Sequence, residues 1–209
     1  MSIITENLKT FLHLGTQINF FNTVILTYRD NEEYLNKVKL PGFYSDAPFT
    51  KAVSGFLQNY QIIIICSLLD EFDKQFIPLK YPEHSEKILK VKEITRPIKK
   101  RINKWKDLKN YRNYILAHNL REKDISIFSE KYTKKTYKIP YSNSEHYLLG
   151  ELAILIINFT TEVFKNEVEK IDLTENILSR IEFEFNDIDS DKELFTIYSE
   201  CLKLLNNCD

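Results

Sequence analysis

The stretch Thr50–Phe76, with the sequence TKAVSGFLQNYQIIIICSLLDEFDKQF, decides the fold of this chain. Its apolar residues surround most of the circumference of a helix, which is typical of a central helix that neighbouring helices cover on several sides. Its most apolar run, Ile62–Leu69, is far shorter than the roughly 20 residues that a membrane-spanning helix needs. We therefore expect a buried core helix and no membrane partner.

Helical patterns continue on the N-terminal side of this central segment. Residues 3–28 carry apolar side chains three or four positions apart, which suits one long amphipathic helix. A loop is expected at residues 40–49, where Pro41, Gly42 and Pro48 interrupt the pattern. Only four glycines and six prolines occur in the 209 residues, which disfavours an all-β fold with many tight turns. The sequence predicts an all-α bundle of long antiparallel helices.

Prolines mark the boundaries of the helices that follow. Pro78 and Pro82 end the central helix, and a short helix is expected over residues 85–95. Pro97 then opens a further helix, because proline is favoured in the first helical turn. We expect this helix to continue without a break to about Asn119.

A basic insertion and a further long helix complete the expected architecture. Residues 121–141 are expected to form a small β-hairpin or an irregular basic insertion. Ser142 and Glu145 have the spacing of a capping box, which predicts the start of a long helix. Residues 172–209 are expected to form an acidic helical appendage. Because no internal repeat or low-complexity linker divides the chain, we expect one domain over residues 1–209.

Charge is unevenly distributed, although the net charge of the chain is −1. Eleven basic residues lie between Lys87 and Arg112 against two acidic ones, a net charge of +9, whereas residues 151–209 carry fourteen acidic and five basic residues, a net charge of −9. Such a basic stretch can gather a polyanion such as RNA by releasing counterions, and the alternative is a solvated lysine-rich helix face. The basic residues expected to contact RNA are Lys99, Lys100, Arg101, Lys104 and Lys109.

Cysteine and histidine spacing disfavours a disulfide framework and a metal site. The three cysteines are scattered and show no Cys-x-x-Cys pair. No second ligand stands three or four positions from His13, His84 or His146, so we expect surface or capping roles for these histidines, no metal ion and no cofactor. The first residues lack the apolar run of a secretory signal, and a reducing cytoplasm is the expected compartment.

The segment Tyr111–Asn119, YRNYILAHN, is the part of the chain that most suggests catalysis. It combines Arg112, whose planar charged fork suits phosphate, with His118, whose proton equilibrium lies near neutral pH. Arg112 also falls near the middle of the apolar stripe of its helix, and such breaks in a pattern tend to mark functional sites. The alternative is an arginine buried against a carboxylate of the central helix. Its candidate partners are Asp70, Glu71 and Asp73.

Helical geometry refines this hypothesis. On a regular α-helix, the six positions from Arg112 to His118 correspond to about 9 Å along the axis and about 120° around it. One helix can hardly direct both side chains onto a single phosphate. Two copies around a two-fold axis would bring both residues of each protomer into one cleft, so we expect a homodimer with a composite site.

The run Arg112-Asn113-Tyr114-Ile115-Leu116-Ala117-His118 resembles the motif of the HEPN superfamily, helical domains that include many RNA-cleaving toxins and antiviral effectors. In that family an arginine, often followed directly by Asn, Asp or His, precedes a histidine by four to six residues. Residues 105–120 are most similar to the abortive-infection AbiU-like branch. The resemblance implies an HEPN-like bundle and a metal-independent endoribonuclease that acts as a toxin or an antiphage effector.

The resemblance also implies roles for individual residues. His118 would act as a general acid or base, Arg112 would stabilise charge on the phosphorane, and Asn113 would orient the phosphate or the histidine. Tyr111 and Tyr114 flank His118 on the helix surface and either stack on bases or pack in the core or an interface. The implied partners are RNA, a second copy and an antitoxin or other inhibitory protein. The alternative is a non-catalytic HEPN-like module that dimerises or binds RNA or protein.

Overall fold

A computed structural model of the chain describes residues 3–35, 37, 49–117, 121–122, 125–126, 129–130, 136–172, 192 and 195. The chain divides into two compact units, Met1–Ile171 and Asp172–Asp209. The boundary falls at the start of the expected acidic appendage. In that second unit, the described residues beyond Asp172 are Lys192 and Phe195, both helical, and the rest of the expected appendage lies outside the described residues.

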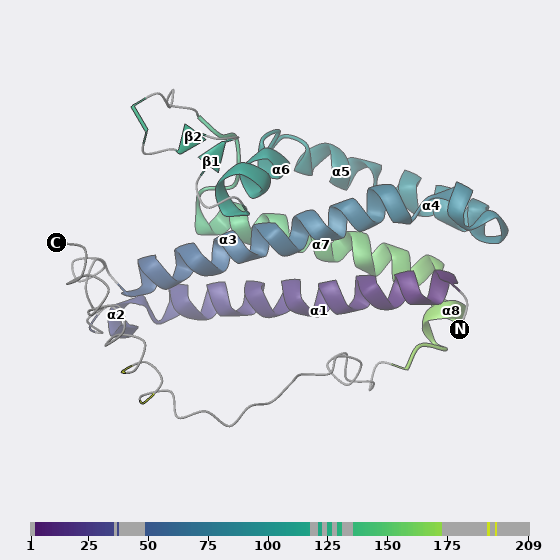
Figure 1. The fold of residues 1–209 in the computed structure, drawn as a ribbon. Coiled ribbons are helices and arrows are strands. Elements are labelled where there is room, and N and C mark those ends of the chain that lie inside the picture. Colours follow the sequence, from purple (N-terminus) through teal and green to yellow (C-terminus); the bar gives the residue numbers. More distant parts are fainter. Residues whose placement is uncertain are drawn as a thin grey trace. The chain divides into compact units, whose positions relative to one another are not determined.

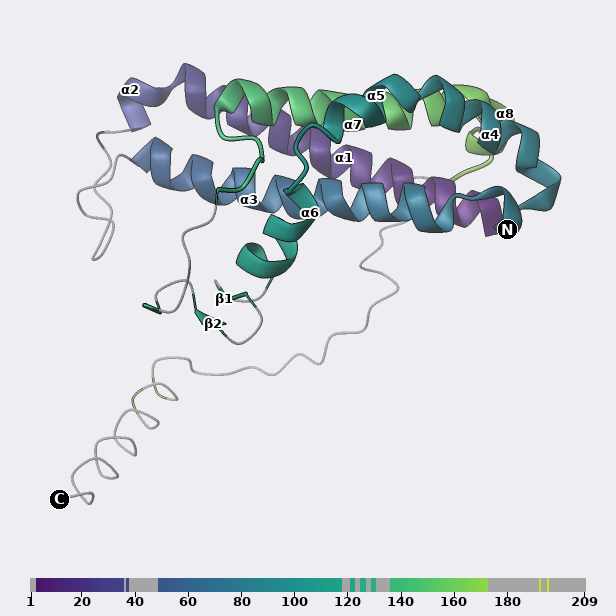
Figure 2. The same ribbon diagram turned by 90° about the horizontal axis from the view of Figure 1, so that it is seen from above.

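Three long helices form the first unit, α1 (Ile3–Asp30), α3 (Phe49–Asp70) and α7 (Asn143–Val163), and they run side by side (Figures 1 and 2). α1 packs against both α3 and α7 and is antiparallel to each. The predicted helix over residues 3–28 and the predicted all-α class are confirmed for the described residues. Short helices flank the three long ones, α2 (Glu32–Leu35) after α1 and α8 (Lys165–Val168) after α7.

The core lies where the three long helices meet. In α3, Ile62, Ile65 and Leu68 are at most 1% exposed, so the predicted buried core helix is confirmed. Four phenylalanines extend the core. The ring centroid of Phe76 lies 5.3 Å from that of Phe11, 5.5 Å from that of Phe164 and 5.9 Å from that of Phe72. Aromatic rings at these separations add to the free energy of area burial.

The central helix is also the one described segment that could cross a membrane by length and composition alone. Val53–Gln75 has a window with a mean hydropathy of 1.2, and 39% of that window is buried inside the protein. Core helices of globular proteins satisfy the same criterion. In this fold the helix packs against α1 and α7.

α3 does not end as a regular helix. A π-helical turn, Glu71–Gln75, follows it, in which the Phe76 amide donates to the Glu71 carbonyl over 3.0 Å. Single-turn 3₁₀ segments then begin at the two prolines, Pro78–Lys80 and Pro82–His84. The next helix, α4 (Ser85–Ile94), matches the predicted short helix.

The predicted unbroken helix from Pro97 to Asn119 is wrong. The structure has α5 (Arg96–Ile102), a bend, α6 (Leu108–Tyr111) and a second π-helical turn, Arg112–Leu116. At the bend, Asp107 and Lys138 exchange hydrogen bonds, since the Asp107 amide donates to the Lys138 carbonyl (3.3 Å) and Asp107 Oδ2 accepts from the Lys138 amide (2.8 Å). A contact between distant residues therefore replaces the helical hydrogen bond of the Asp107 amide.

The start of α7 has the predicted capping box. Ser142 Oγ accepts from the Glu145 amide (3.2 Å), and Glu145 Oε2 accepts from the Ser142 amide (3.3 Å). Before α7, β1 (Arg121–Glu122) and β2 (Ile125–Ser126) pair antiparallel, with Arg121 opposite Ser126. Most of the remaining expected insertion, and residues 40–48 of the expected loop, lie outside the described residues.

Candidate functional site

Arg112 lies at the junction between α6 and the second π-helical turn. The Ala117 amide donates to the Arg112 carbonyl over 2.9 Å, a hydrogen bond that spans five residues rather than four. π-helical turns are rare and are frequent at functional sites. The expected 9 Å and 120° between Arg112 and His118 assume a regular α-helix, and Arg112–Leu116 depart from that geometry. His118 itself lies outside the described residues.

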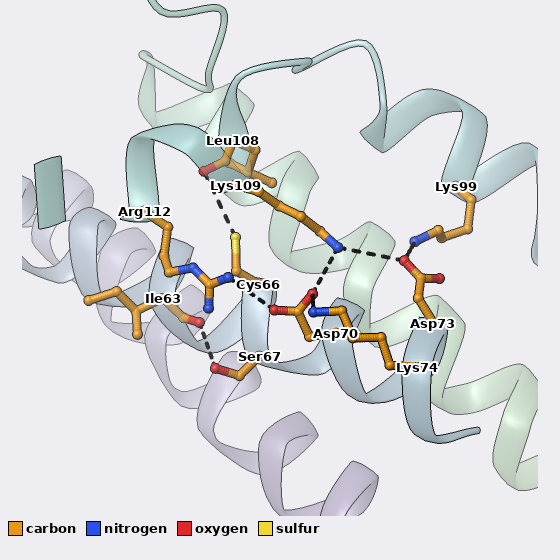
Figure 3. Close-up of polar contacts among 10 residues, drawn as sticks. All are labelled: Ile63, Cys66, Ser67, Asp70, Asp73, Lys74, Lys99, Leu108, Lys109 and Arg112. Carbon is orange, nitrogen blue, oxygen red and sulfur yellow. Dashed lines mark hydrogen bonds and ion pairs between the residues drawn. The ribbon is translucent and has the colours of Figure 1, made fainter. Parts of the chain in front are cut away.

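The side chain of Arg112 makes an ion pair with the central helix. Its Nη2 donates to Asp70 Oδ2 over 3.0 Å, and the side chain keeps 22% of its surface exposed (Figure 3). The arginine Nε is buried, and the described residues offer it no hydrogen-bond partner. Of the three carboxylates expected as alternative partners, Asp70 is the one that pairs with the arginine.

Asp70 lies at the centre of a group of cations. Its second oxygen, Oδ1, accepts from Lys109 Nζ at 2.9 Å and pairs with Lys74 Nζ at 3.2 Å (Figure 3). Partial burial opposes ionisation of Asp70, but the hydrogen bonds from Lys109, Lys74 and Arg112 outweigh it. They lower the pKa of Asp70 to about 2, so this carboxylate is charged throughout the neutral range.

A second carboxylate extends the group along the same surface. Asp73 Oδ2 lies 2.7 Å from Lys99 Nζ and 3.8 Å from Lys109 Nζ, so Lys109 connects the two aspartates. We call these six residues the aspartate cluster. Its members are Asp70, Asp73, Lys74, Lys99, Lys109 and Arg112. Four cations around two carboxylates leave an excess of two positive charges, which favours anions.

The residues expected to bind RNA differ in their surroundings. Lys100 and Lys104 are exposed, and the Arg101 guanidinium lies 4.2 Å from the centroid of the Trp105 ring. Lys99 and Lys109 belong to the aspartate cluster, with 19% and 43% of their side chains exposed. The charge along residues 87–112 is therefore partly neutralised by Asp70 at the end of α3 and Asp73 in the following π-helical turn, which a count along that stretch leaves out.

Lys92 belongs to the same basic stretch and is bound inside the protein. Its Nζ lies 3.6 Å from the centroid of the Phe72 ring and donates to the Phe72 carbonyl. That carbonyl is free because the first π-helical turn directs the Phe76 amide to Glu71 instead. Burial lowers the pKa of Lys92 to about 8. The lysine caps the π-helical turn that follows α3, a role with no local signal in the sequence.

The tyrosines and Asn113 of the motif are half-buried. The ring of Tyr111 meets Tyr137 edge to face with centroids 5.5 Å apart, and burial raises the pKa of its hydroxyl. In this contact Tyr111 packs against another side chain of the protein, which is the alternative to stacking on RNA bases. Beneath α6, the buried Cys66 thiol lies 4.0 Å from the Leu108 carbonyl, and burial raises its pKa to about 11. Cys66 is therefore a protonated packing residue under the arginine.

His146 is buried, so its expected surface or capping role is wrong. It is 3% exposed, and its Nδ1 lies 3.1 Å from Gln61 Oε1. Gln61 Nε2 donates to Asn22 Oδ1 (2.6 Å), and Asn22 Nδ2 donates to Glu151 Oε1 (3.0 Å). Burial lowers the pKa of His146 to about 4. The result is a buried polar network across α1, α3 and α7, which the glutamine inside an apolar run could have signalled.

Among the described residues, no group of three or more His, Cys, Asp or Glu side chains could hold a metal ion. The comparisons with known proteins add no assignment. No family model matches the sequence, and neither a curated relative nor a solved structure is detectably similar to it.

Proposed function

We propose that this chain is an HEPN-like endoribonuclease that cleaves RNA without a metal ion and serves as a toxin or an antiphage effector. The single observation that carries the proposal is the setting of Arg112 at a π-helical turn, within a cluster that has two excess positive charges. Among the described residues, Asp70 accepts from Arg112 Nη2 alone, and Nε is buried, so the Nη groups are the part of the planar fork that can meet a phosphodiester.

The fold supports the same proposal at a coarser level. Antiparallel packing of α1 against α3 and α7 suits an HEPN-like bundle, and β1 and β2 suit a small hairpin insertion after the motif. We further propose that the protein acts in the cytoplasm as a homodimer, and that an antitoxin or other inhibitory protein controls it. The proposal includes no membrane partner.

The proposed chemistry is an internal transfer within RNA. One His118 takes the proton of the 2′-hydroxyl, the 2′-oxygen attacks the adjacent phosphorus, and the bond to the 5′-oxygen breaks. The His118 of the second copy gives a proton to that leaving oxygen, and a 2′,3′-cyclic phosphate remains. Arg112 stabilises the charge that builds on the phosphorane, and Asn113 orients the phosphate.

Labelled RNA incubated with the protein in excess EDTA tests the proposal. We expect cleavage with 2′,3′-cyclic phosphate ends, and a loss of about 10²-fold to 10⁴-fold in His118→Ala, the range typical of a general acid or base. Arg112→Ala should show a comparable loss. Lys90→Ala removes an exposed lysine of α4, remote from the motif in sequence, and serves as the control. Full activity in either motif variant would contradict the proposal.

A second function is favoured by one specific observation. The ion pair between Arg112 and Asp70 gives the arginine a structural partner, as expected for a module that binds RNA or protein without catalysis. Wild-type protein that cleaves none of a set of structurally varied RNAs, but binds them, would support this function instead.

A further inference from the structure

Asp70 uses its two oxygens for two different cations of the aspartate cluster. Oδ2 accepts from Arg112 Nη2 at 3.0 Å, and Oδ1 accepts from Lys109 Nζ at 2.9 Å (Figure 3). The two cations come from neighbouring turns of the chain, on either side of the junction between α6 and the π-helical turn. One carboxylate therefore fixes the separation between a guanidinium and an ammonium group.

The position of Asp70 makes it a suitable fixed point. It is the last residue of α3, between Leu69 at 2% exposure and Phe72 at 1% exposure, and so it is anchored in the core. Its own side chain is only 21% exposed. The Arg112 side chain, in contrast, leaves from a π-helical turn and has one hydrogen-bonded carboxylate among the described residues. The conformation of the Arg112 side chain thus depends on its hydrogen bond to Asp70.

We propose that Asp70 is a positioning residue, which holds Arg112 and Lys109 so that both cations face one phosphodiester of the RNA. This inference rests on the proposed ribonuclease function and deepens it. Asp70 does not contact the reacting atoms. It acts through Arg112, whose remaining N–H groups meet the charge that develops on the phosphorane.

Positioning by a carboxylate has an unusual consequence for kinetics. A negative charge beside a bound phosphate weakens binding, whereas a misplaced arginine slows the chemical step. Asp70→Asn, which keeps the shape of the side chain, should therefore tighten RNA binding by about fivefold, the effect of a unit charge about 4 Å away in water. The same variant should lower kcat by about 100-fold, as small misplacements of catalytic groups do.

The rival idea is that Asp70 merely competes with RNA for the cations, and this idea predicts that both affinity and kcat rise in Asp70→Asn. Glu93→Gln is the matched charge control, because Glu93 is an exposed acid within the same basic stretch and lies outside the aspartate cluster. It should leave kcat unchanged and alter affinity by less than about twofold, since exposed charges are screened.

The experiment measures RNA affinity by fluorescence anisotropy and kcat by single-turnover cleavage for wild type, Asp70→Asn and Glu93→Gln. Tighter binding with slower cleavage in Asp70→Asn alone supports the proposal. If wild type cleaves RNA and Asp70→Asn cleaves it at least as fast, Asp70 does not position the arginine, while the ribonuclease function stands.

If wild type does not cleave RNA, the proposed function fails, and a binding cycle still tests the role of Asp70. Arg112→Ala should weaken RNA binding by about fivefold or more in the wild-type background, and by less than about twofold in the Asp70→Asn background, because the arginine is no longer held in place. An equal or larger loss in the Asp70→Asn background would overturn the proposal.

Discussion

Gly150 shows how a single residue determines the packing of two helices. A Cβ at this position of α7 would collide with the carboxamide of Asn22, which links Gln61 to Glu151 in the buried polar network. Gly150→Ala should therefore displace Asn22 and leave buried polar groups without partners, at a cost of about 1–3 kcal/mol in the free energy of unfolding. Urea unfolding, monitored by circular dichroism, measures this loss.

Gly55 provides the control for that prediction. It lies inside α3, and nothing stands within 4 Å of a Cβ placed there. Gly55→Ala should stabilise the protein by about 0.5–1 kcal/mol, because alanine loses less backbone entropy in a helix. A similar effect of the two substitutions would contradict the collision with Asn22.

The burial of His146, again a single residue, predicts that the free energy of unfolding depends on pH. Burial lowers its pKa from 6.5 to about 4, so the unfolded chain binds a proton at a higher pH than the folded chain does. The contribution to stability is complete above pH 6.5, falls as the pH drops toward 4 and levels off below, by roughly 3 kcal/mol in total. Urea midpoints between pH 7 and pH 4 should fall more steeply for wild type than for His146→Gln. Parallel slopes would mean that His146 takes up its proton at the same pH in the folded and the unfolded chain.

The capping box of α7 carries a prediction at the scale of one helix. Ser142 Oγ is the acceptor for the Glu145 amide, which has no partner within the helix. Ser142→Ala should cost about 1 kcal/mol and speed amide exchange in the first turn of α7. Ser144→Ala, two positions further along and exposed, is the control and should leave both quantities nearly unchanged. Equal exchange in the two variants would show that the cap does not hold this turn.

Elements with a local signal in the sequence could be predicted, and elements set by distant contacts could not. The helix over residues 3–28, the capping box and the central helix follow from periodicity and short spacings. The bend before α6 depends on hydrogen bonds between Asp107 and Lys138, residues that no local pattern connects. For Arg112 the sequence predicts three candidate partners, the carboxylates of Asp70, Glu71 and Asp73, which lie within one helical turn. Only the packing of α6 and the following π-helical turn on α3 selects Asp70. Lys92 is buried by its contact with Phe72, and His146 by the packing of α7 on α3, and neither contact follows from a local pattern.

At the scale of the whole molecule, the proposed nuclease needs two chains, and this need can be tested without knowing the interface. Arg112→Ala homodimers would keep two copies of His118 and no Arg112, and His118→Ala homodimers would keep the reverse. A mixed dimer would keep one of each in the shared cleft. That single His118 can supply only one of the two proton transfers, so we expect the two variants, unfolded and refolded together, to cleave RNA faster than either variant refolded alone but more slowly than wild type. Mixed dimers are half of all dimers for random pairing of equal amounts. Light scattering should give twice the mass of one chain under the same conditions. Refolding each variant alone is the control, and a mixture as inactive as its components would contradict a site shared between two copies.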